Sequence, residues 1–335
     1  FIDFIPSILL GAPDEDTVLS ILPGHQLLKK GEGYQAIYLT VLGSFGGIII
    51  ILILTPFFIF ILPKLENIIN LLIPYLLILS TLFLIKKEKY KIAALTIFIL
   101  SGFLGIAVLN SSLNQPLLPM LSGLFGTSSL IISLKSKTKI PNQKIIIKKI
   151  KKKFLIKPLS ASLVSSPLCS FLPGLGSGQA AVLGMSFIKN SKQNFLILLG
   201  ATNTIVIGLS FIVLYSLGKS RTGVASSLLS LKENILFNDV LIILAVIILT
   251  GIICFNYTLF ISRIMLKLIN KIPYSFLSVV IIGLIIIIVF LFTGFYGLFV
   301  LFVSTFVGLF GILSNVKRIN LMGCLVVPVI LIYLL

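Results

Sequence analysis

Residues 172–178 read Leu-Pro-Gly-Leu-Gly-Ser-Gly and interrupt an apolar region where a membrane-spanning helix would otherwise continue. Residues 11–16, Gly-Ala-Pro-Asp-Glu-Asp, interrupt the apolar sequence earlier, near the start of the chain, so we call them the first break and residues 172–178 the second break. The apolar arms beside both breaks are too short to cross a bilayer alone, because a helical span needs about 20 residues. Backbone without helical hydrogen bonds is not tolerated in lipid, so such breaks lie inside protein or beside a water-filled cavity. We therefore expect the functional site at these breaks.

The composition is that of a membrane protein. The chain has 335 residues, of which 58% are hydrophobic and 11% charged, and its mean hydropathy is +1.18. Soluble domains carry about 25% charged residues. Strand-like alternation is absent, so we expect an all-α, polytopic, multi-pass protein of the cell membrane. The net charge of +18 comes from lysines in the loops between apolar segments. Membrane topology explains them better than nucleic-acid binding, which we do not expect.

The apolar segments predict about eight to ten transmembrane helices plus re-entrant hairpins. We expect a first membrane half over residues 1–134, a cytoplasmic Lys-rich loop over residues 135–158 and a second membrane half over residues 159–335. The chain begins with Phe1 inside an apolar segment, so we also expect an N-terminal truncation. The expected spans are residues 34–62, 67–85, 92–110, 116–134, 194–217, 239–261, 273–293, 295–315 and 320–335, and the expected hairpins are residues 4–28, 159–188 and 218–231.

The basic loops predict the topology. Cytoplasmic loops of membrane proteins are enriched in Lys and Arg, and ten lysines without an acidic residue lie between Lys135 and Lys157. Every basic loop can be placed on the inside only if residues 159–188 do not cross the membrane, which predicts a re-entrant hairpin there. The Lys-rich loop is then expected to contact anionic lipid. The hairpins at 4–28 and 218–231 precede spans of opposite direction, as in inverted-repeat transporters.

The break at residues 172–178 has two interpretations. Its glycines permit tight turns, and backbone amides at the following helix start favour an anion. The alternative is close helix packing, for which glycine is common in membranes. The neighbouring proline and serine, together with the predicted topology, favour a functional break. The candidate substrate-binding residues here are Pro173, Gly174, Gly176, Ser177 and Gly178.

The first break carries three adjacent acidic residues, Asp14-Glu15-Asp16. Carboxylates at membrane depth are costly and are by default functional or paired. They could face a cavity as a cation or proton site, or lie at the surface in an ordinary hairpin tip. On the first interpretation Asp14 or Asp16 would couple a cation, with Gly11 and Pro13 shaping the turn.

A third polar interruption, residues 217–223, aligns with the first and places Arg221 opposite Asp14. The two charges could pair, or Arg221 could bind a substrate carboxylate through two hydrogen bonds, which the neighbouring Lys219 would do less specifically. The alternative is that Arg221 extends to the membrane interface. Lys219, Ser220 and Arg221 are therefore candidate substrate-binding residues.

Two further polar features lie beside apolar sequence. Thr202 and Asn203, inside a predicted span, either coordinate a substrate or ion or bond a neighbouring helix. His25 is the only histidine, and we favour a loop residue near the inside over a proton relay.

The sequence offers no credible enzyme site. Gly218-Lys219-Ser220 resembles the end of a phosphate-binding loop but lacks the glycine five residues upstream. An intramembrane serine protease needs a Gly-x-Ser-Gly element, and residue 175 is Leu. An aspartyl protease needs a second membrane acid, whereas Glu233 and Asp239 are expected in a loop. We therefore expect no enzymatic activity, no metal site and no cofactor.

The chain resembles the large membrane subunit of tripartite tricarboxylate transporters, the TctA-like permeases. Residues 8–19 and 28–32 resemble that family's first-half hairpin, residues 123–126 and 172–176 match second-half landmarks, and residues 318–331 look like a family C-terminus. The chain departs from the family where the two Pro-Gly turns become Pro13-Asp14 and Ser220-Arg221.

The resemblance implies a secondary-active permease for a small organic anion, such as a di- or tricarboxylate, coupled to a sodium or proton gradient. It also implies a small membrane subunit and an extracytoplasmic binding protein as partners. The charged departures leave the substrate and the partners open. The rival interpretation is an integral membrane protein without transport activity, such as a scaffold or lipid-interacting protein.

Overall fold

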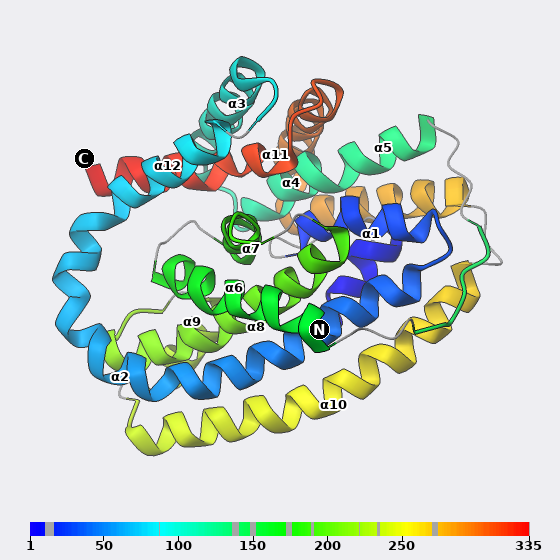
Figure 1. Ribbon diagram of the computed structural model, residues 1–335. Helices are drawn as coiled ribbons and strands as arrows, with labels where there is room; N and C mark the ends of the chain where they lie inside the picture. Colours follow the sequence, from blue (N-terminus) through cyan, green and yellow to red (C-terminus); the bar gives the residue numbers. More distant parts are fainter. Residues whose placement is uncertain are drawn as a thin grey trace. The chain divides into compact units, whose positions relative to one another are not determined.

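The computed structural model describes residues 1–10, 17–86, 88–135, 141–147, 152–171, 176–188, 191–220, 222–232, 235–269 and 274–334. These residues form helices and their connections, with no strand among them (Figure 1). The prediction of an all-α protein is therefore confirmed. The elements, in chain order, are η1 (Pro6–Leu10), η2 (Val18–Ser20), α1 (Ile21–Leu28), α2 (Gly33–Lys86), α3 (Lys91–Leu109), α4 (Leu117–Leu121), η3 (Ser122–Thr127), α5 (Ser128–Lys135), α6 (Lys152–Phe171), α7 (Ser177–Met185), α8 (Lys192–Leu217), α9 (Gly223–Leu231), α10 (Phe237–Ile269), α11 (Tyr274–Leu313), η4 (Arg318–Met322) and α12 (Gly323–Leu334).

Six helices among the described residues are long and apolar enough to cross a membrane. Together they make this a multi-pass membrane protein, as the composition predicts. Counts of eight to ten spans, and two halves of inverted topology, stay predictions. The six candidate spans are Gly33–Lys64, Lys91–Leu109, Leu117–Lys135, Lys192–Leu217, Phe237–Ile269 and Ser278–Leu313.

Of two predicted boundaries between spans, one is absent from the structure and the other is present. The helix α2 continues as 54 residues where the sequence predicts two spans, 34–62 and 67–85. Conversely, α11 is interrupted at Gly294, whose φ of 66° and ψ of −161° are not helical. Residues other than glycine rarely adopt such a positive φ. This break falls between the predicted spans 273–293 and 295–315, so the sequence places it correctly.

The helices form two compact units that interleave along the chain. Unit 1 contains Phe1–Phe4, Tyr34–Ile73 and Ile145–Ile264, and unit 2 contains Ile5–Gly33, Pro74–Lys144 and Met265–Leu335. The division of the chain into membrane halves at residues 134 and 159 stays a prediction.

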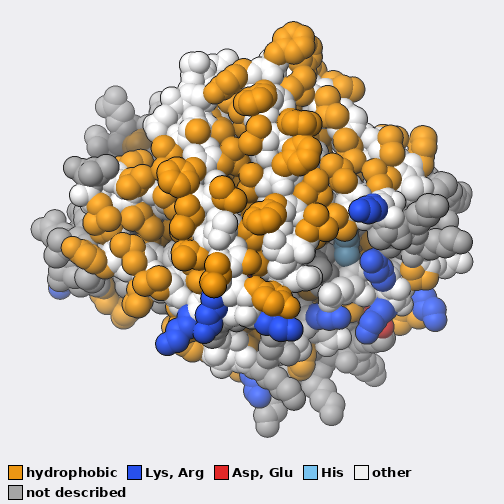
Figure 2. Space-filling model, turned by 90° about the horizontal axis from the view of Figure 1, so that it is seen from above, with side chains coloured by type: hydrophobic (Ala, Val, Ile, Leu, Met, Phe, Trp, Pro, Cys, Tyr) orange, Lys and Arg blue, Asp and Glu red, His pale blue; other side chains and the backbone are white. Residues whose placement is uncertain are grey.

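The helix α8 is the centre of unit 1. In its most apolar 18-residue window 78% of the residues are buried, against 11% in the corresponding window of α10. The core around it joins side chains of α2 and α8, including Ile51, Leu62, Ile205 and Val213. Exposed Ile and Leu side chains along α10 are what a lipid-facing helix presents. Figure 2 shows apolar side chains over most of the visible described surface.

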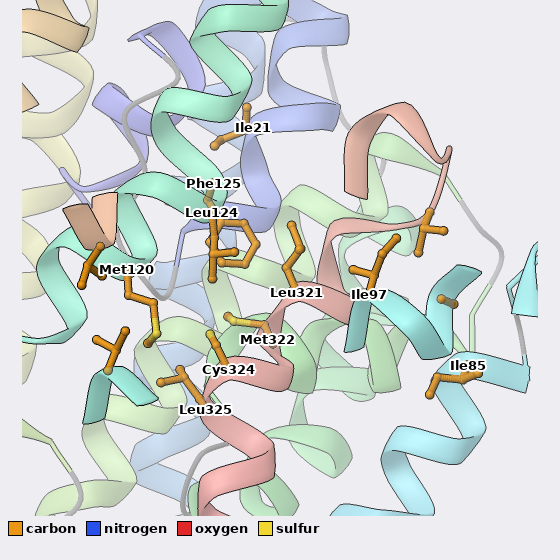
Figure 3. Close-up of a cluster of buried hydrophobic side chains, with 14 residues drawn as sticks. Ile21, Ile85, Ile97, Met120, Leu124, Phe125, Leu321, Met322, Cys324 and Leu325 are labelled. Carbon is orange, nitrogen blue, oxygen red and sulfur yellow. The ribbon is translucent and has the colours of Figure 1, made fainter. Parts of the chain in front are cut away.

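Unit 2 has its own apolar core, shown in Figure 3. Met120, Leu124 and Phe125, on α4 and η3, contact the η4–α12 segment. Glycines let the backbones approach closely here, since a Cβ at Gly105 on α3 would overlap the carbonyl group of Cys324 on α12. Small residues at helix contacts are usual in membranes, where packing replaces the hydrophobic effect. The other core side chains include Ile21, Ile85, Ile97, Leu321, Met322 and Leu325.

One side chain of the predicted Lys-rich loop joins two helix ends within unit 2. Gln143 is 6% exposed. Its Nε2 donates to the carbonyl oxygen of Leu28 at 2.8 Å, at the end of α1, and its Oε1 accepts from the backbone N–H of Gly33 at 2.9 Å, at the start of α2. The first and last backbone groups of a helix have no partner inside the helix. Gln143 therefore satisfies one such group on each side of the α1–α2 turn.

Replacing Gln143 by Ala is expected to lower the free energy of unfolding by about 1–3 kcal/mol, because the buried N–H of Gly33 loses its partner. The carbonyl oxygen of Leu28 loses one of two donors and keeps the N–H of Gly31 at 3.0 Å. A fall in the thermal unfolding midpoint of the purified protein in detergent measures this. Lys144→Ala is the matched control, since Lys144 joins the same turn through its backbone N–H, 3.0 Å from the carbonyl oxygen of Gly31. Equal midpoints for the two variants would contradict a capping role.

Candidate functional site

The structure describes seven of the fourteen predicted site residues. Those that lie outside the described residues are Gly11, Pro13, Asp14, Asp16, Pro173, Gly174 and Arg221. Those that it describes are Gly176, Ser177, Gly178, Thr202, Asn203, Lys219 and Ser220.

The second break lies between α6 and α7, which contact each other and α8 within unit 1. The helix resumes at Ser177, inside the predicted break of residues 172–178, and Ser177 is fully buried. With nine residues, α7 extends only about 14 Å, less than half of the hydrocarbon thickness. That length is compatible with a re-entrant hairpin, which stays a prediction.

Thr202 ties α8 to the start of α7. Its hydroxyl lies 3.1 Å from the carbonyl oxygen of Ser177 and 3.0 Å from that of Leu199, one turn back on its own helix. The side chain is completely buried. Of the two interpretations of Thr202 in the sequence, bonding to a neighbouring helix is the one that these contacts support.

The adjacent Asn203 contacts a different part of unit 1. Its Nδ2 donates to Asp3 Oδ2 at 2.8 Å, across 200 residues of sequence. Asn203 is 3% exposed, and its Oδ1 is buried without a hydrogen-bond partner among the described residues. A buried acceptor of this kind calls for an explanation, because more than about 90% of buried polar groups have a partner.

Asp3 and Asn203 line a pocket of about 180 Å³ within unit 1, which we call the Asp3 pocket. Its walls come from the N-terminal segment, α2, α8 and α10. Most of the wall is aliphatic, and the polar lining consists of Asp3, Asn203, Thr204 and Thr250. The full set of described lining residues is Phe1, Asp3, Ile48, Ile51, Asn203, Thr204, Ile207, Gly208, Ile247, Thr250, Gly251 and Cys254.

The sequence predicts Asn203 as a site residue but misses Asp3. A signal was present, because Asp3 is an acidic residue between Ile2 and Phe4 in an apolar segment, and such residues are functional candidates by default. What no sequence pattern showed was the partner, since Asp3 and Asn203 meet only through the packing of unit 1.

The third predicted break is a turn between α8 and α9. Gly218 ends α8 with a φ of 65°, in the left-handed region. Thr222 then caps α9 by accepting from the backbone N–H of Ala225 at 3.3 Å. Lys219 and Ser220 are exposed in this turn, and neither is among the described residues that line the Asp3 pocket.

His25 lies in α1 of unit 2, rather than in the loop that the sequence favours. This helix is not among the six candidate spans. Burial of the imidazole, with smaller contributions from the positive charges of Arg318 and Lys29, lowers the pKa of His25 to about 4. The ring is therefore neutral at pH 7.

The polar residues of η4 also have partners in unit 2. Arg318 Nη1 donates to Ser129 Oγ at 2.5 Å. The carboxylate of Glu88 accepts from Asn320 Nδ2 at 3.2 Å and lies 3.5 Å from Lys317 Nζ. These contacts join the α2–α3 loop and α5 to the start of the C-terminal segment, which is a structural role.

Comparisons with known proteins give one family. The model of the tripartite tricarboxylate transporter TctA family matches residues 1–323. An uncharacterized protein of Methanocaldococcus jannaschii is 32% identical over 346 aligned residues, which cover all of this chain and 85% of that protein. No solved structure matches.

Proposed function

The chain belongs to the tripartite tricarboxylate transporter TctA family, and we propose that it is a secondary-active permease for a small organic anion of the di- or tricarboxylate class, coupled to a cation gradient. The observation that carries this proposal is the family match over residues 1–323, which includes the breaks at residues 11–16, 172–178 and 217–223. Six helices able to cross a membrane agree with it. The family is one of transporters, which is in line with a protein that is not an enzyme.

The proposed anion site lies at the breaks of residues 172–178 and 217–223, which contain positively charged side chains or hydrogen-bond donors. Backbone amides of residues 173–178 would donate to one carboxylate, because α7 begins there and the start of a helix carries partial positive charge. Arg221, assisted by Lys219 and Ser220, would bind a second carboxylate through two parallel hydrogen bonds. Asp14 and Asp16 repel an anion, so their proposed role is with the cation.

The proposed partners follow from the same membership. A small membrane subunit and an extracytoplasmic binding protein would deliver the solute, as the word tripartite in the family name indicates. The lysines of residues 135–157 would contact anionic lipid on the cytoplasmic side. Nucleic acid is not among the proposed partners.

Thermal stabilisation of the purified protein by solutes tests the proposal. A ligand that binds only the folded state raises the unfolding midpoint, by an amount that grows with the logarithm of its concentration once this exceeds the dissociation constant. We expect such a rise with at least one di- or tricarboxylate, and a larger one when the coupling cation, sodium or the proton, is also supplied. The same solute should be taken up into proteoliposomes. If no dicarboxylate or tricarboxylate stabilises the protein or is taken up, the proposed transport function is contradicted. That result would favour the rival interpretation, a membrane scaffold without transport activity.

Replacing Arg221 by Gln is expected to weaken solute binding by a factor of about 10 to 100, since a charge-assisted hydrogen-bonded pair contributes about 1.5–3 kcal/mol. The dissociation constant from the same thermal titration is the measurement. Lys267→Gln, at an exposed lysine on α10, removes one positive charge elsewhere and serves as control. Unchanged binding and uptake in Arg221→Gln would remove Arg221 from the anion site.

A further inference from the structure

We propose that Arg318 binds a carboxylate group of a small organic anion, at a site in unit 2 that Ser129 and His25 border. This site goes beyond the proposed function, because it uses neither Arg221 nor the break at residues 172–178. Its occupation also does not require transport. We call it the Arg318 site.

Three elements of unit 2 form the Arg318 site, and they meet first in an apolar cluster to which α1, η3 and η4 each contribute (Figure 3). About one turn away from these cluster residues, on the same face of each element, a polar side chain takes their place. The polar side chains therefore form the next layer. The pairs of cluster residue and polar residue are Ile21 and His25, Phe125 and Ser129, and Leu321 and Arg318.

The guanidinium of Arg318 has more hydrogen-bond donors than partners. It carries five N–H groups, and one of them donates to Ser129 Oγ at 2.5 Å. The hydroxyl of Ser129 donates to the carbonyl oxygen of Phe125, which leaves its oxygen as an acceptor for Arg318. Among the described residues, Arg318 has no further hydrogen bond and no ion pair within 4 Å. The remaining N–H groups are therefore available to a ligand.

The cost of leaving this charge without a partner is the reason to expect a ligand. Arg318 is half-buried, and burial removes much of the water from its guanidinium. A charge that is taken out of water without a counter-charge destabilises a protein by several kcal/mol. Because the residue is not completely buried, an anion can reach it.

The acidic side chain beside η4 does not supply the counter-charge. The carboxylate of Glu88 accepts from Asn320 Nδ2 at 3.2 Å and lies 3.5 Å from Lys317 Nζ. Glu88 thus pairs with residues on either side of Arg318 in the sequence, and not with Arg318 itself. The Arg318 site keeps its positive charge.

The position of the site favours a solute over a lipid headgroup. Ser129 lies in the candidate span Leu117–Lys135, nearer its middle than its end. The carbonyl oxygen of Asn320 accepts from Ser101 at 3.3 Å, and Ser101 lies near the middle of the span Lys91–Leu109. The segment η4 therefore lies beside the middle of two spans, whereas lipid phosphates lie outside the hydrocarbon core. Ionisable groups at such depth are by default functional or paired.

The backbone that leads to Ser129 supports a functional role. The element η3 is a π-helix of six residues, Ser122–Thr127, within the same span. Single π-helical turns inside α-helices occur frequently at functional sites. A π turn adds about one residue to the helix, so it changes the face of α5 on which Ser129 lies.

The class of ligand follows from the geometry and the charge of Arg318. A planar guanidinium matches the two oxygens of a carboxylate through parallel hydrogen bonds. One carboxylate also balances one guanidinium. A phosphate monoester carries about −1.5 to −2 charges at pH 7, which exceeds the single charge here because the neighbouring imidazole of His25 is neutral at that pH.

Arg318→Met tests the site, because it removes the charge and keeps a long side chain. The parent protein is Arg221→Gln, so that the proposed anion site does not contribute. The unfolding midpoint in detergent is followed at pH 7.5 as sodium citrate or succinate replaces sodium chloride at constant ionic strength. Without carboxylate, Arg318→Met should be as stable as the parent or more stable, since an unpaired charge is gone. With carboxylate, the parent midpoint should rise, and Arg318→Met should lose at least about tenfold in apparent affinity.

Lys135→Gln is the matched control, because it removes an exposed positive charge at the end of α5. It should keep the carboxylate response of the parent. Arg318→Lys keeps the charge but cannot form two parallel hydrogen bonds, and it is the second variant if Arg318→Met does not fold. A weaker carboxylate response in Arg318→Lys supports the site, and an unchanged one contradicts it.

The proposal is overturned if Arg318→Met lowers the midpoint equally with and without carboxylate, which is the result of a structural role alone. It is also overturned if Arg318→Met keeps the full response, or if phosphatidylglycerol added to the detergent gives an Arg318-dependent rise that citrate and succinate do not give. Failure of the proposed function gives a different pattern. In that case the carboxylate response remains and depends on Arg318, while no di- or tricarboxylate enters proteoliposomes.

Discussion

Alanine at Gly43 or Gly200 is expected to destabilise unit 1 by about 1–3 kcal/mol or more, the usual cost of forcing extra carbon into a packed interior. The helices α2 and α8 cross at these two glycines. A Cβ at Gly43 would overlap the carbonyl oxygen of Ile197, and a Cβ at Gly200 would overlap that of Thr40. Because both obstacles are backbone atoms, the helices themselves must move apart.

The crossing also contains a hydrogen bond that separation would break. Ser44 Oγ donates to the carbonyl oxygen of Gly200 at 3.1 Å. Thermal unfolding in detergent and the fraction of monodisperse protein on size exclusion measure the loss.

Gly283→Ala is the control, since nothing lies within 4 Å of a Cβ added there. Alanine in a helix interior is favoured over glycine by about 1 kcal/mol, so this variant should be neutral or slightly more stable. The double variant Gly43→Ala/Gly200→Ala should cost less than the sum of the single ones, because one separation relieves both overlaps. If either single variant is as stable as the unaltered chain, the close backbone contact between α2 and α8 at these glycines is contradicted.

Acidification from pH 6.5 to pH 4 is expected to destabilise the protein through His25, by an amount that reaches about 3 kcal/mol for a shift of the pKa from 6.5 to about 4. In this window the unfolded chain binds a proton at His25 and the folded chain does not, so stability falls as the pH falls. Above pH 6.5 the group is neutral in both states and contributes no pH dependence.

The measurement compares the unfolding midpoint of the unaltered chain with that of His25→Gln at half-unit steps from pH 7.5 to pH 4. Carboxylates titrate at the lower end of this range in both proteins, so the difference between the two curves isolates the imidazole. The midpoint of the unaltered chain should fall relative to that of His25→Gln as the pH falls. Curves that stay parallel across the whole range would show that His25 is accessible to protons in the folded protein.

The fold could be predicted from the sequence where one local signal dominates. A helix that resumes after the Pro- and Gly-rich residues could be predicted, although it begins at Ser177, inside the predicted break. The break at Gly294 lies where two apolar runs meet. The continuity of α2 was missed, because residues 63–66 separate the two predicted apolar spans, 34–62 and 67–85, and the helix runs through them. A gap between apolar runs does not by itself show whether the helix ends there.

The candidate site, too, could be predicted only where a residue gives a local signal. Asn203 could be found as a polar residue within an apolar span, a signal that needs no partner. Asp3 could not be joined to it, since 200 residues separate them and only packing brings them to 2.8 Å. The roles proposed for residues 11–16 and 172–175 stay predictions, because these residues lie outside the described ones.

Thr202 and Asn203 are neighbours in sequence, and their side chains reach different parts of unit 1. Thr202 bonds the start of α7, beside the proposed anion site, and Asn203 bonds Asp3 in the N-terminal segment. Because the two side chains belong to consecutive residues of α8, a displacement of this helix alters both contacts together. The start of α7 and the N-terminal segment are thus joined mechanically through one peptide unit.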